Sequence, residues 1–326
     1  MSDRPDNSRH RWVTGFCWAL AGIFTAALLL RVFGLEGGGF PIVQLVAFTP
    51  YVLLLSLPAL LVVVLLRRWR PAGLILLTAV VLAALVLPRQ FGGPESVPQG
   101  KPVRILTSNL AKGNADSKAL IRLANDREAD LVFLQEISAA KAAELRRSGI
   151  LEKYPHRVLD VTARKGGGAI YSKWPLEARE PLTAGRQPRA VVAVPGWGRV
   201  EVVSVHPTAP IKPGTTRQWD RDYDSMPAAF SARHPLILAG DFNATLDHEN
   251  LRELIATGYR DAADVTGNGF ISTWPSRISR SLPVTIDHVL AEQGILFSGY
   301  EVAKVRGSDH RAIFAELMLA PEPAES

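Results

Sequence analysis

The amino-acid sequence predicts an α/β sandwich of two packed sheets, preceded by three membrane-spanning helices. Long uncharged apolar runs fill the first 89 residues, and short β-branched runs separated by turns and helices follow from Val103. Dense strands interspersed with helices, without strict alternation, are typical of two sheets with helices outside. The predicted parts are a membrane region (1–89), a Gly- and Pro-rich linker (90–102), a folded domain (103–320) and a disordered tail (321–326).

Three stretches of the N-terminal region contain no charged residue. They cover residues 12–30, 37–66 and 71–88, which is nineteen, thirty and eighteen residues. A helix needs roughly 20 apolar residues to cross a bilayer, so the third is at the lower limit. The alternative is three buried helices of a soluble core, which would have to be apolar on every side and packed back to back. A cleaved signal peptide would explain the first stretch alone. No charge inside the stretches marks a transport pathway, so we expect an anchor.

Basic residues flank these stretches unevenly. They are Arg4, Arg9 and Arg11 before the first stretch, and Arg67, Arg68 and Arg70 between the second and the third. The excess of positive charge in cytoplasmic loops places both groups in the cytoplasm. Three crossings would then put the C-terminal domain outside the cytoplasm, on an integral protein of the plasma membrane.

The net charge of +6 does not indicate a nucleic-acid-binding surface. From Gly100 onward there are 29 Lys and Arg and 27 Asp and Glu, so this part carries only +2. The remaining positive charge lies beside the predicted membrane spans, where it indicates membrane topology and not a nucleic-acid-binding surface. The single cysteine, Cys17, lies in the first predicted span, which excludes a disulfide in the C-terminal domain.

The folded domain has ten predicted strands and two predicted helices. The helices cover residues 115–128 and 138–147. The strands cover residues 103–109, 130–134, 156–161, 168–172, 190–194, 200–205, 236–239, 285–290, 300–304 and 312–317.

Polar residues stand at or near the ends of several of these strands. In chain order they are Asn109, Glu136, His206, Asp241 with Asn243, Asp287, and Asp309 with His310. Acidic residues beside a core need a cationic partner. The oxygens of Glu136, Asp309 and Asn109 are hard ligands that suit Mg²⁺ or Mn²⁺.

The ordered set N, LQE, H, GDFNA, IDH and GSDH resembles the endonuclease/exonuclease/phosphatase superfamily, which includes DNase I-like nucleases and bacterial sphingomyelinases. The resemblance covers Val103 to about Leu317. Each motif alone is common, whereas all six in this order are specific. The resemblance implies a DNase I-like sandwich, with Glu136 as principal metal ligand and Asn109 and Asp309 completing the metal site.

The resemblance also implies roles for the other polar residues. Asp241 would orient or deprotonate the attacking water, and Asn243 would hold that water and a phosphate oxygen. His310 would face the scissile phosphate, with Asp287 fixing its tautomer, and His206 would donate to a non-bridging oxygen. Phosphate ester hydrolysis needs such a positioned water and such positive charge. Whether Asp241 or His310 is the general base stays open.

Five of these residues also have a purely structural explanation. Asn109 could cap a turn, Glu136 could pair with an arginine, and His206 could be a loop residue before proline. Asp241 and Asn243 could form an Asx turn.

Several neighbouring residues are secondary candidates. Tyr171 could reach the phosphate or lie in the core, and Arg189 could add positive charge or pair with a carboxylate. Trp274 is expected to pack beside the site, and Trp219 could line a cleft.

The sequence therefore predicts a membrane-anchored, Mg²⁺- or Mn²⁺-dependent phosphoesterase. It would hydrolyse a phosphodiester, either a phospholipid head group or nucleic acid, by metal-assisted attack of water. A catalytic domain tethered at the membrane surface meets lipid head groups first, and its predicted loops lack an aromatic series for stacking bases. The alternative is a catalytically silent membrane scaffold that binds a phosphorylated partner.

Overall fold

The computed structural model describes residues 7–35, 39–96, 102–161, 166–182, 187–277 and 281–319. The chain forms two compact units. The helical unit contains residues 1–88 with 247–249, and the sandwich unit contains residues 89–246 and 250–326. The predicted tail and residues 97–101 of the predicted linker lie outside the described residues.

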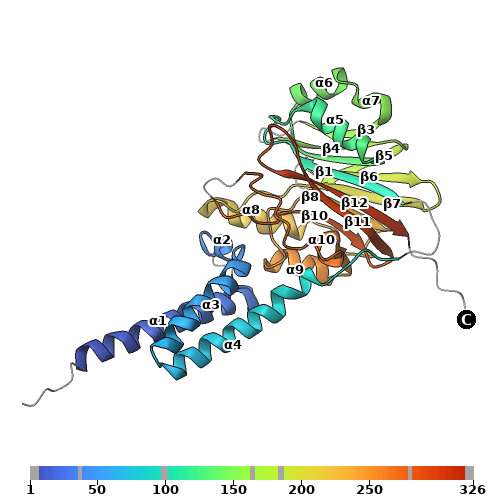
Figure 1. Cartoon of the computed structure of the whole chain (residues 1–326). Helices are drawn as coiled ribbons and strands as arrows, with labels where there is room; N and C mark the ends of the chain where they lie inside the picture. Colours follow the sequence, from blue (N-terminus) through green and yellow to red (C-terminus); the bar gives the residue numbers. More distant parts are fainter. Residues whose placement is uncertain are drawn as a thin grey trace, which may run out of the picture. The chain divides into compact units, whose positions relative to one another are not determined.

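Four helices form most of the helical unit (Figure 1). They are α1 (Asn7–Val32), α2 (Ile42–Val46), α3 (Thr49–Leu65) and α4 (Trp69–Val86), and a 3₁₀ turn (Leu87–Gln90) continues α4. Within the described residues, two helices are long and apolar enough to cross a membrane: Ser8–Val32 with 25 residues and Trp69–Gln90 with 22.

The second apolar stretch does not form one long helix, so the prediction of three spans is not confirmed. The chain divides this stretch into α2 and α3, and α3 has 17 residues with Pro58 inside it. At 1.5 Å per residue α3 is about 26 Å long, against about 30 Å of hydrocarbon. Two crossings would return the chain to its starting side. A C-terminal domain outside the cytoplasm therefore requires a third crossing, which α2 and α3 would have to make together.

The packing of the helical unit suits an apolar surrounding. Cys17, Ala21 and Ile75 belong to a small core between helices. Large leucines such as Leu54 and Leu77 are exposed on α3 and α4. Helices with small residues inside and leucines outside are typical of a membrane environment.

The sandwich unit contains two six-stranded sheets (Figure 1). The order in the first sheet is β11 (Ile295–Lys304), β12 (Arg311–Leu319), β1 (Val103–Asn109), β2 (Leu131–Ile137), β4 (Gly167–Ser172) and β3 (His156–Asp160). The order in the second sheet is β5 (Leu176–Leu182), β6 (Gln187–Val194), β7 (Gly198–Val205), β8 (Leu236–Asp241), β10 (Asp287–Glu292) and β9 (Tyr259–Asp261).

Alternation along the central strands builds a core on each face of the first sheet. Ile105 and Phe133 belong to the core between the sheets. Their neighbours Leu106 and Leu134 pack on the opposite face, in a second core that includes Leu120 of α5. Successive strand side chains point to opposite faces, and strands buried on both faces are apolar throughout. The predicted α/β sandwich is confirmed.

Among the described residues, six helices accompany the sheets. They are α5 (Ser117–Asp126), α6 (Ala139–Arg147), α7 (Ile150–Lys153), α8 (Pro213–Asp224), α9 (Glu249–Ala256) and α10 (Ala262–Val265). Asp116 and Ser138 begin α5 and α6 by accepting hydrogen bonds from Ala119 N and Lys141 N. Such N-caps satisfy backbone donors that have no partner inside the helix.

The strand directions bring the predicted site residues to one edge of the sandwich. β1 runs parallel to β2 and β7 runs parallel to β8, so each pair ends at the same edge. β10 is antiparallel to β8 and begins where β8 ends, with Asp287 opposite Asp241. β12 is antiparallel to β1 and begins near the end of β1.

Candidate active site

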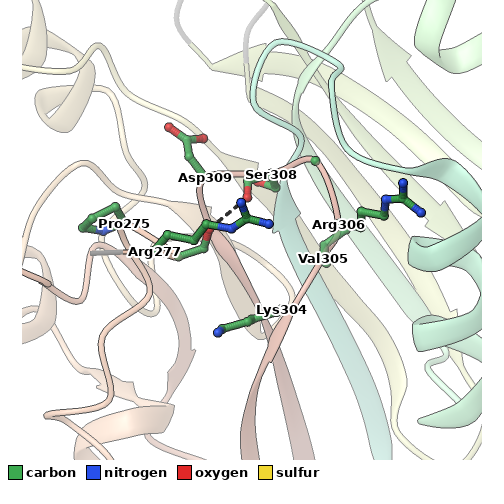
Figure 2. A pocket seen from close by; sticks show the side chains of 9 residues that line it. Pro275, Arg277, Lys304, Val305, Arg306, Ser308 and Asp309 are labelled. Carbon is green, nitrogen blue, oxygen red and sulfur yellow. Dashed lines mark hydrogen bonds between the residues drawn. The ribbon is translucent and has the colours of Figure 1, made fainter. Parts of the chain in front are cut away.

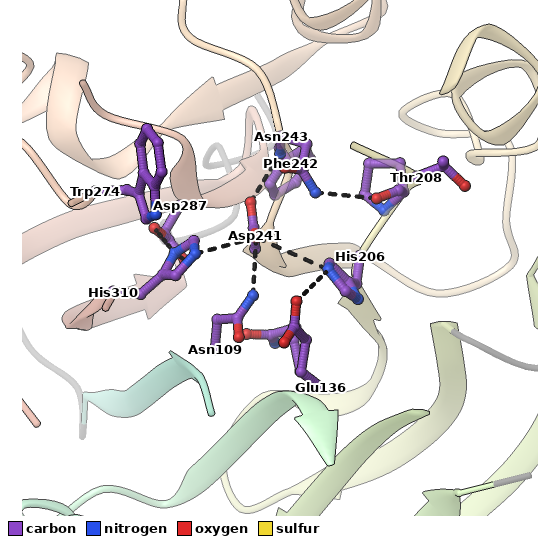
Figure 3. Close-up of polar contacts among 12 residues, drawn as sticks. Asn109, Glu136, His206, Thr208, Asp241, Phe242, Asn243, Trp274, Asp287 and His310 are labelled. Atoms are coloured by element: carbon purple, nitrogen blue, oxygen red, sulfur yellow. Dashed lines mark hydrogen bonds and ion pairs between the residues drawn. The ribbon is translucent and has the colours of Figure 1, made fainter. Parts of the chain in front are cut away.

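Asp241, the last residue of β8, lies at the centre of the polar contacts at this edge (Figure 3). Ile237 and Ala239 face the core between the sheets, so Asp241 continues their face. Asn109 Nδ2 donates to Asp241 Oδ2 and Asn243 N donates to Asp241 Oδ1, each at 2.9 Å. The carboxylate is 2% exposed and is held in one orientation by these two bonds.

Two histidines flank the Asp241 carboxylate. His310 Nε2 lies 3.7 Å and His206 Nε2 lies 3.9 Å from Asp241 Oδ2. These distances are too long for direct hydrogen bonds and leave room for a bridging water or phosphate oxygen. The arrangement can therefore hold an oxygen-rich ligand between one carboxylate and two imidazoles.

His310 is held by a carboxylate and by a serine. Its Nδ1 lies 2.9 Å from Asp287 Oδ2, which directs Nε2 toward Asp241. The backbone N of His310 donates to Ser308 Oγ at 3.0 Å, and Ser308 Oγ donates to Asn109 O at 2.7 Å. Ser308 thus joins the start of β12 to the end of β1.

The site concentrates charge in a buried place. Burial raises the pKa of the Asp241 carboxyl, and the positive charge of His310 offsets part of this effect. Burial lowers the pKa of His310, but the carboxylates of Asp287 and Asp241 outweigh burial and raise it to about 10. The two carboxylates therefore favour the protonated, cationic form of the His310 ring.

Glu136 reaches the site through an irregularity in β2. Its φ is 55°, and the pairing of β2 with β4 shifts register between Gln135 and Ile137. Glu136 Oε2 accepts from Lys112 N at 2.6 Å, and Oε1 lies 3.8 Å from His206 Nε2. Gly166 is necessary here, because it has a φ of 92° and a Cβ would lie 2.8 Å from the Glu136 Cα. Such strain is common at functional sites.

The structure brings the predicted metal ligands together only in part. Asn109 of β1 pairs with Gln135 of β2, the residue before Glu136 (Figure 3), and the side-chain oxygens of Asn109 and Glu136 are of the kind that suits Mg²⁺ or Mn²⁺. Asn109 Oδ1 accepts one bond, from Ala111 N at 2.9 Å, which leaves it a second lone pair. Asp309 Oδ2 accepts from Trp274 Nε1 at 3.4 Å, and Asp309 lines a neighbouring cavity.

A different group has the tight spacing of a metal site. In the part of the chain that the structure describes, three His, Asp or Glu side chains have potential ligand atoms within 4.8 Å of one another. They are Asp241, Asp287 and His310. His310 and Asp287 already share a hydrogen bond, which needs a proton where a metal would sit. A metal ion bound between these two side chains would have to displace that proton.

Asn243 differs in detail from its predicted role. It has a φ of 49°, its backbone N holds Asp241, and its Nδ2 donates to Pro207 O at 3.0 Å. The amide NH₂ group therefore ties the end of β8 to the loop after His206. The Asx turn considered as a structural explanation is present as well.

A polar layer beneath the site had not been predicted. Gln135 Nε2 donates to Ser204 Oγ at 3.1 Å and to Thr107 Oγ1 at 3.2 Å, which links the two sheets. His206 N donates to Gln187 Oε1 at 3.1 Å. The signal in the sequence is a polar residue at an inward position of an apolar strand, one or two residues before the strand end, as at Thr107, Gln135 and Ser204.

Of the secondary candidates, Trp274 lies beside the candidate site, whereas Trp219 and Tyr171 are buried and Arg189 is paired with a carboxylate. Trp219 and Tyr171 are each 1% exposed, so the suggestion that Trp219 lines a cleft is wrong. Burial raises the pKa of Tyr171 to about 12. Arg189 pairs with Glu201. The Trp274 ring lies 6.4 Å from the His310 ring, beside the site as predicted.

Solved structures of other proteins share the fold of the sandwich unit. An endonuclease/exonuclease/phosphatase from Beutenbergia cavernae DSM 12333 has a TM-score of 0.52 at 20% identity, over 69% of this chain and 74% of that chain. One from Bacteroides vulgatus has a TM-score of 0.52 at 18% identity, over 68% and 100%. A humanized D. rerio TDP2 with 14 mutations has a TM-score of 0.51 at 17% identity, over 67% and 99%.

The sequence comparisons give the family. No curated protein matches the chain. The model of the endonuclease/exonuclease/phosphatase family matches residues 106–310, which includes every residue placed at the site above. Members of this family hydrolyse phosphoester bonds, usually with a divalent metal. The chain therefore belongs to the endonuclease/exonuclease/phosphatase family.

Proposed function

We propose that this chain is a membrane-anchored, divalent-metal-dependent phosphodiesterase. One observation carries the proposal: Asp241 Oδ2 lies within 3.7 Å and 3.9 Å of the Nε2 atoms of His310 and His206. A carboxylate between two imidazoles can position a water and neutralise a phosphate at the same time. A module that only binds phosphate has no need of the buried carboxylate, which supports the enzyme over the silent scaffold.

Each residue has a proposed part in the reaction. Asp241, fixed by Asn109 and Asn243, orients the attacking water and accepts its proton. His310, turned by Asp287, and His206 donate hydrogen bonds to phosphate oxygens. A divalent cation held by Glu136 and Asn109, with Asp309 completing its ligands, would supply further positive charge to the phosphate.

The helical unit is the proposed anchor. Its support is the length of α1 and α4 and the exposed leucines of α3 and α4. We propose that the N-terminus is cytoplasmic and that the sandwich unit is outside, which requires α2 and α3 to cross together. Added protease should then degrade the sandwich unit on sealed vesicles of outward orientation. Protection until detergent is added would place the sandwich unit inside.

Hydrolysis of bis(p-nitrophenyl) phosphate by the full chain in detergent tests the catalytic proposal. We expect turnover with Mg²⁺ or Mn²⁺, loss with EDTA, and a fall of about 10–100-fold or more in Glu136→Gln at limiting metal. Arg233→Ala is the matched control, because this exposed residue precedes β8 at the edge opposite Asp241. Metal binding without turnover on this ester or on lipid and nucleic-acid diesters would favour the scaffold.

A further inference from the structure

A cavity of about 560 Å³ lies between two loop segments of the sandwich unit (Figure 2). Residues 275–277 form one wall, and residues 304–309, where β11 leads into β12, form the other. Ser276 joins the walls: its N donates to Asp309 O at 2.6 Å and its Oγ donates to Ser308 O at 2.9 Å. We call this space the basic cavity.

Exposed cationic side chains dominate the charge of the basic cavity. Its cations are Arg277, Lys304 and Arg306, and its one carboxylate is Asp309. Among the described residues, neither Arg277 nor Lys304 has an ion-pair partner. Arg306 also borders a second cavity together with Asp116. Three cationic side chains against one carboxylate leave the cavity with a positive balance, which favours a bound anion.

The basic cavity adjoins the proposed reaction centre. Asp309 lines the cavity and immediately precedes His310, whose Nε2 faces Asp241. Trp274, next to the cavity wall, contacts Asp309 through Nε1 at 3.4 Å. A group bound in the cavity can therefore belong to the same small molecule as a phosphate held between His310 and His206.

The lining of the cavity favours one kind of anion. None of the described residues that line the cavity has an aromatic side chain on which a nucleobase could stack. A guanidinium and an ammonium together suit a compact dianion such as a phosphomonoester. We propose that the basic cavity binds a second phosphate group of the substrate, which is then a compact phosphodiester carrying an additional phosphomonoester. This identification of the substrate class rests on the proposed function.

Binding of inorganic phosphate to the full chain in EDTA tests the cavity without any turnover. Calorimetry should show a dissociation constant that rises about tenfold in Arg277→Ala and in Lys304→Ala, the size expected for one lost charged hydrogen bond. Lys304→Arg, which keeps the charge, and Arg233→Ala should bind like the original chain. Equal affinity in all variants, or weakening by His206→Ala alone, would overturn the assignment.

Two chromogenic substrates test the second phosphate during catalysis. Thymidine 5′-(p-nitrophenyl phosphate) and its 3′-phosphorylated form have the same scissile bond and differ by one phosphomonoester. We expect a higher kcat/KM for the phosphorylated form, and a ratio that falls about tenfold in Lys304→Ala. A ratio near one, or a preference for single-stranded oligonucleotides over both, would overturn the compact substrate. If neither is hydrolysed, the proposed function fails, while phosphate affinity in EDTA still decides the cavity.

Discussion

Two histidine–aspartate pairs lie on opposite faces of strand β10. In each pair Nδ1 of the histidine faces the aspartate, and the two pairs differ in what the other ring nitrogen, Nε2, faces. His310 Nδ1 lies 2.9 Å from Asp287 Oδ2, and its Nε2 faces Asp241 Oδ2 at 3.7 Å. His288 Nδ1 lies 2.8 Å from Asp261 Oδ2, and its Nε2 lies 2.9 Å from Ala244 O. Of these two histidines, His310 is the one whose Nε2 lies far enough from its neighbouring oxygen to admit a ligand between them.

The difference teaches that a buried histidine beside a carboxylate is not by itself a catalytic group. Both nitrogens of His288 face oxygen acceptors, so the ring is best satisfied as a fully hydrogen-bonded cation. Asp261 also caps α10 by accepting from Asp264 N at 2.9 Å. His288 and Asp261 thus join β10, β9 and α10, whereas His310 and Asp287 leave one N–H for chemistry.

Removal of His310 should give the largest effect. His310→Ala should lower kcat/KM on bis(p-nitrophenyl) phosphate by about 10⁴-fold, because both the positive charge and the oriented N–H are lost. Because this change also leaves the buried Asp287 carboxylate without its partner, the activity should be compared per folded protein, well below the thermal midpoint of the variant. Retention of more than a tenth of the activity would place His310 with His288 as a structural residue.

Asp287 should act through His310. Asp287→Asn should lower kcat/KM by about 10³-fold, because an amide cannot hold the ring as the carboxylate does. The double variant His310→Ala/Asp287→Asn should be no slower than His310→Ala alone, since the two side chains work as a unit. Multiplicative losses would show that Asp287 contributes independently, for example as a ligand of the cation.

Removal of His288 should cost stability instead of activity. His288→Leu leaves the Asp261 carboxylate buried without its partner, which costs about 3 kcal/mol. The thermal midpoint of the sandwich unit, followed by tryptophan fluorescence in the full chain, should fall by about 6–12 °C. The activity of the folded fraction at low temperature should stay within a few-fold. A loss as large as that of His310→Ala would contradict the division of roles.

Much of the fold could be predicted because the central strands are apolar and regular. β1, β4 and β7 lie close to their predicted ranges. β5 was missed because its side chains are mostly exposed and show no alternation, and β9 was missed because it has three residues. α8 was missed because it is polar apart from side chains such as Trp219 and Tyr223. The count of three spans is not confirmed, because an uninterrupted apolar stretch does not fix where one helix ends and the next begins.

The site was predictable where a side chain simply extends the inward face of a strand. Asn109, Asp241 and Asp287 are of this kind, and the parallel and antiparallel pairings bring them together. Glu136 needs a positive φ, and Asp309 is oriented by contacts with Trp274 and Ser276, which no local pattern reveals.

Partners across the fold are harder to predict still. Asp261 meets His288 only because β9 pairs with β10, and Gln135 meets Ser204 only because the two sheets pack. The sequence therefore singles out Asp287 of the IDH motif as a candidate site residue, whereas the pairing of His288 with Asp261 follows only from the fold.

The smallest expected effect is the pH dependence of the thermal midpoint, which tests the structural role of the His288–Asp261 pair. Burial lowers the pKa of His288, but Asp261 and the carbonyl of Ala244 outweigh burial, so the folded pKa is raised above the usual 6.5. The charged pair therefore stabilises the fold fully below about pH 6.5, and this stabilisation is lost as the pH rises through the folded pKa of His288. The difference in thermal midpoint between the original chain and His288→Asn should be larger at pH 6 than at pH 9. A difference that grows with pH would mean that His288 is neutral in the folded protein, and that Asp261 is held by its bond to Asp264 N instead.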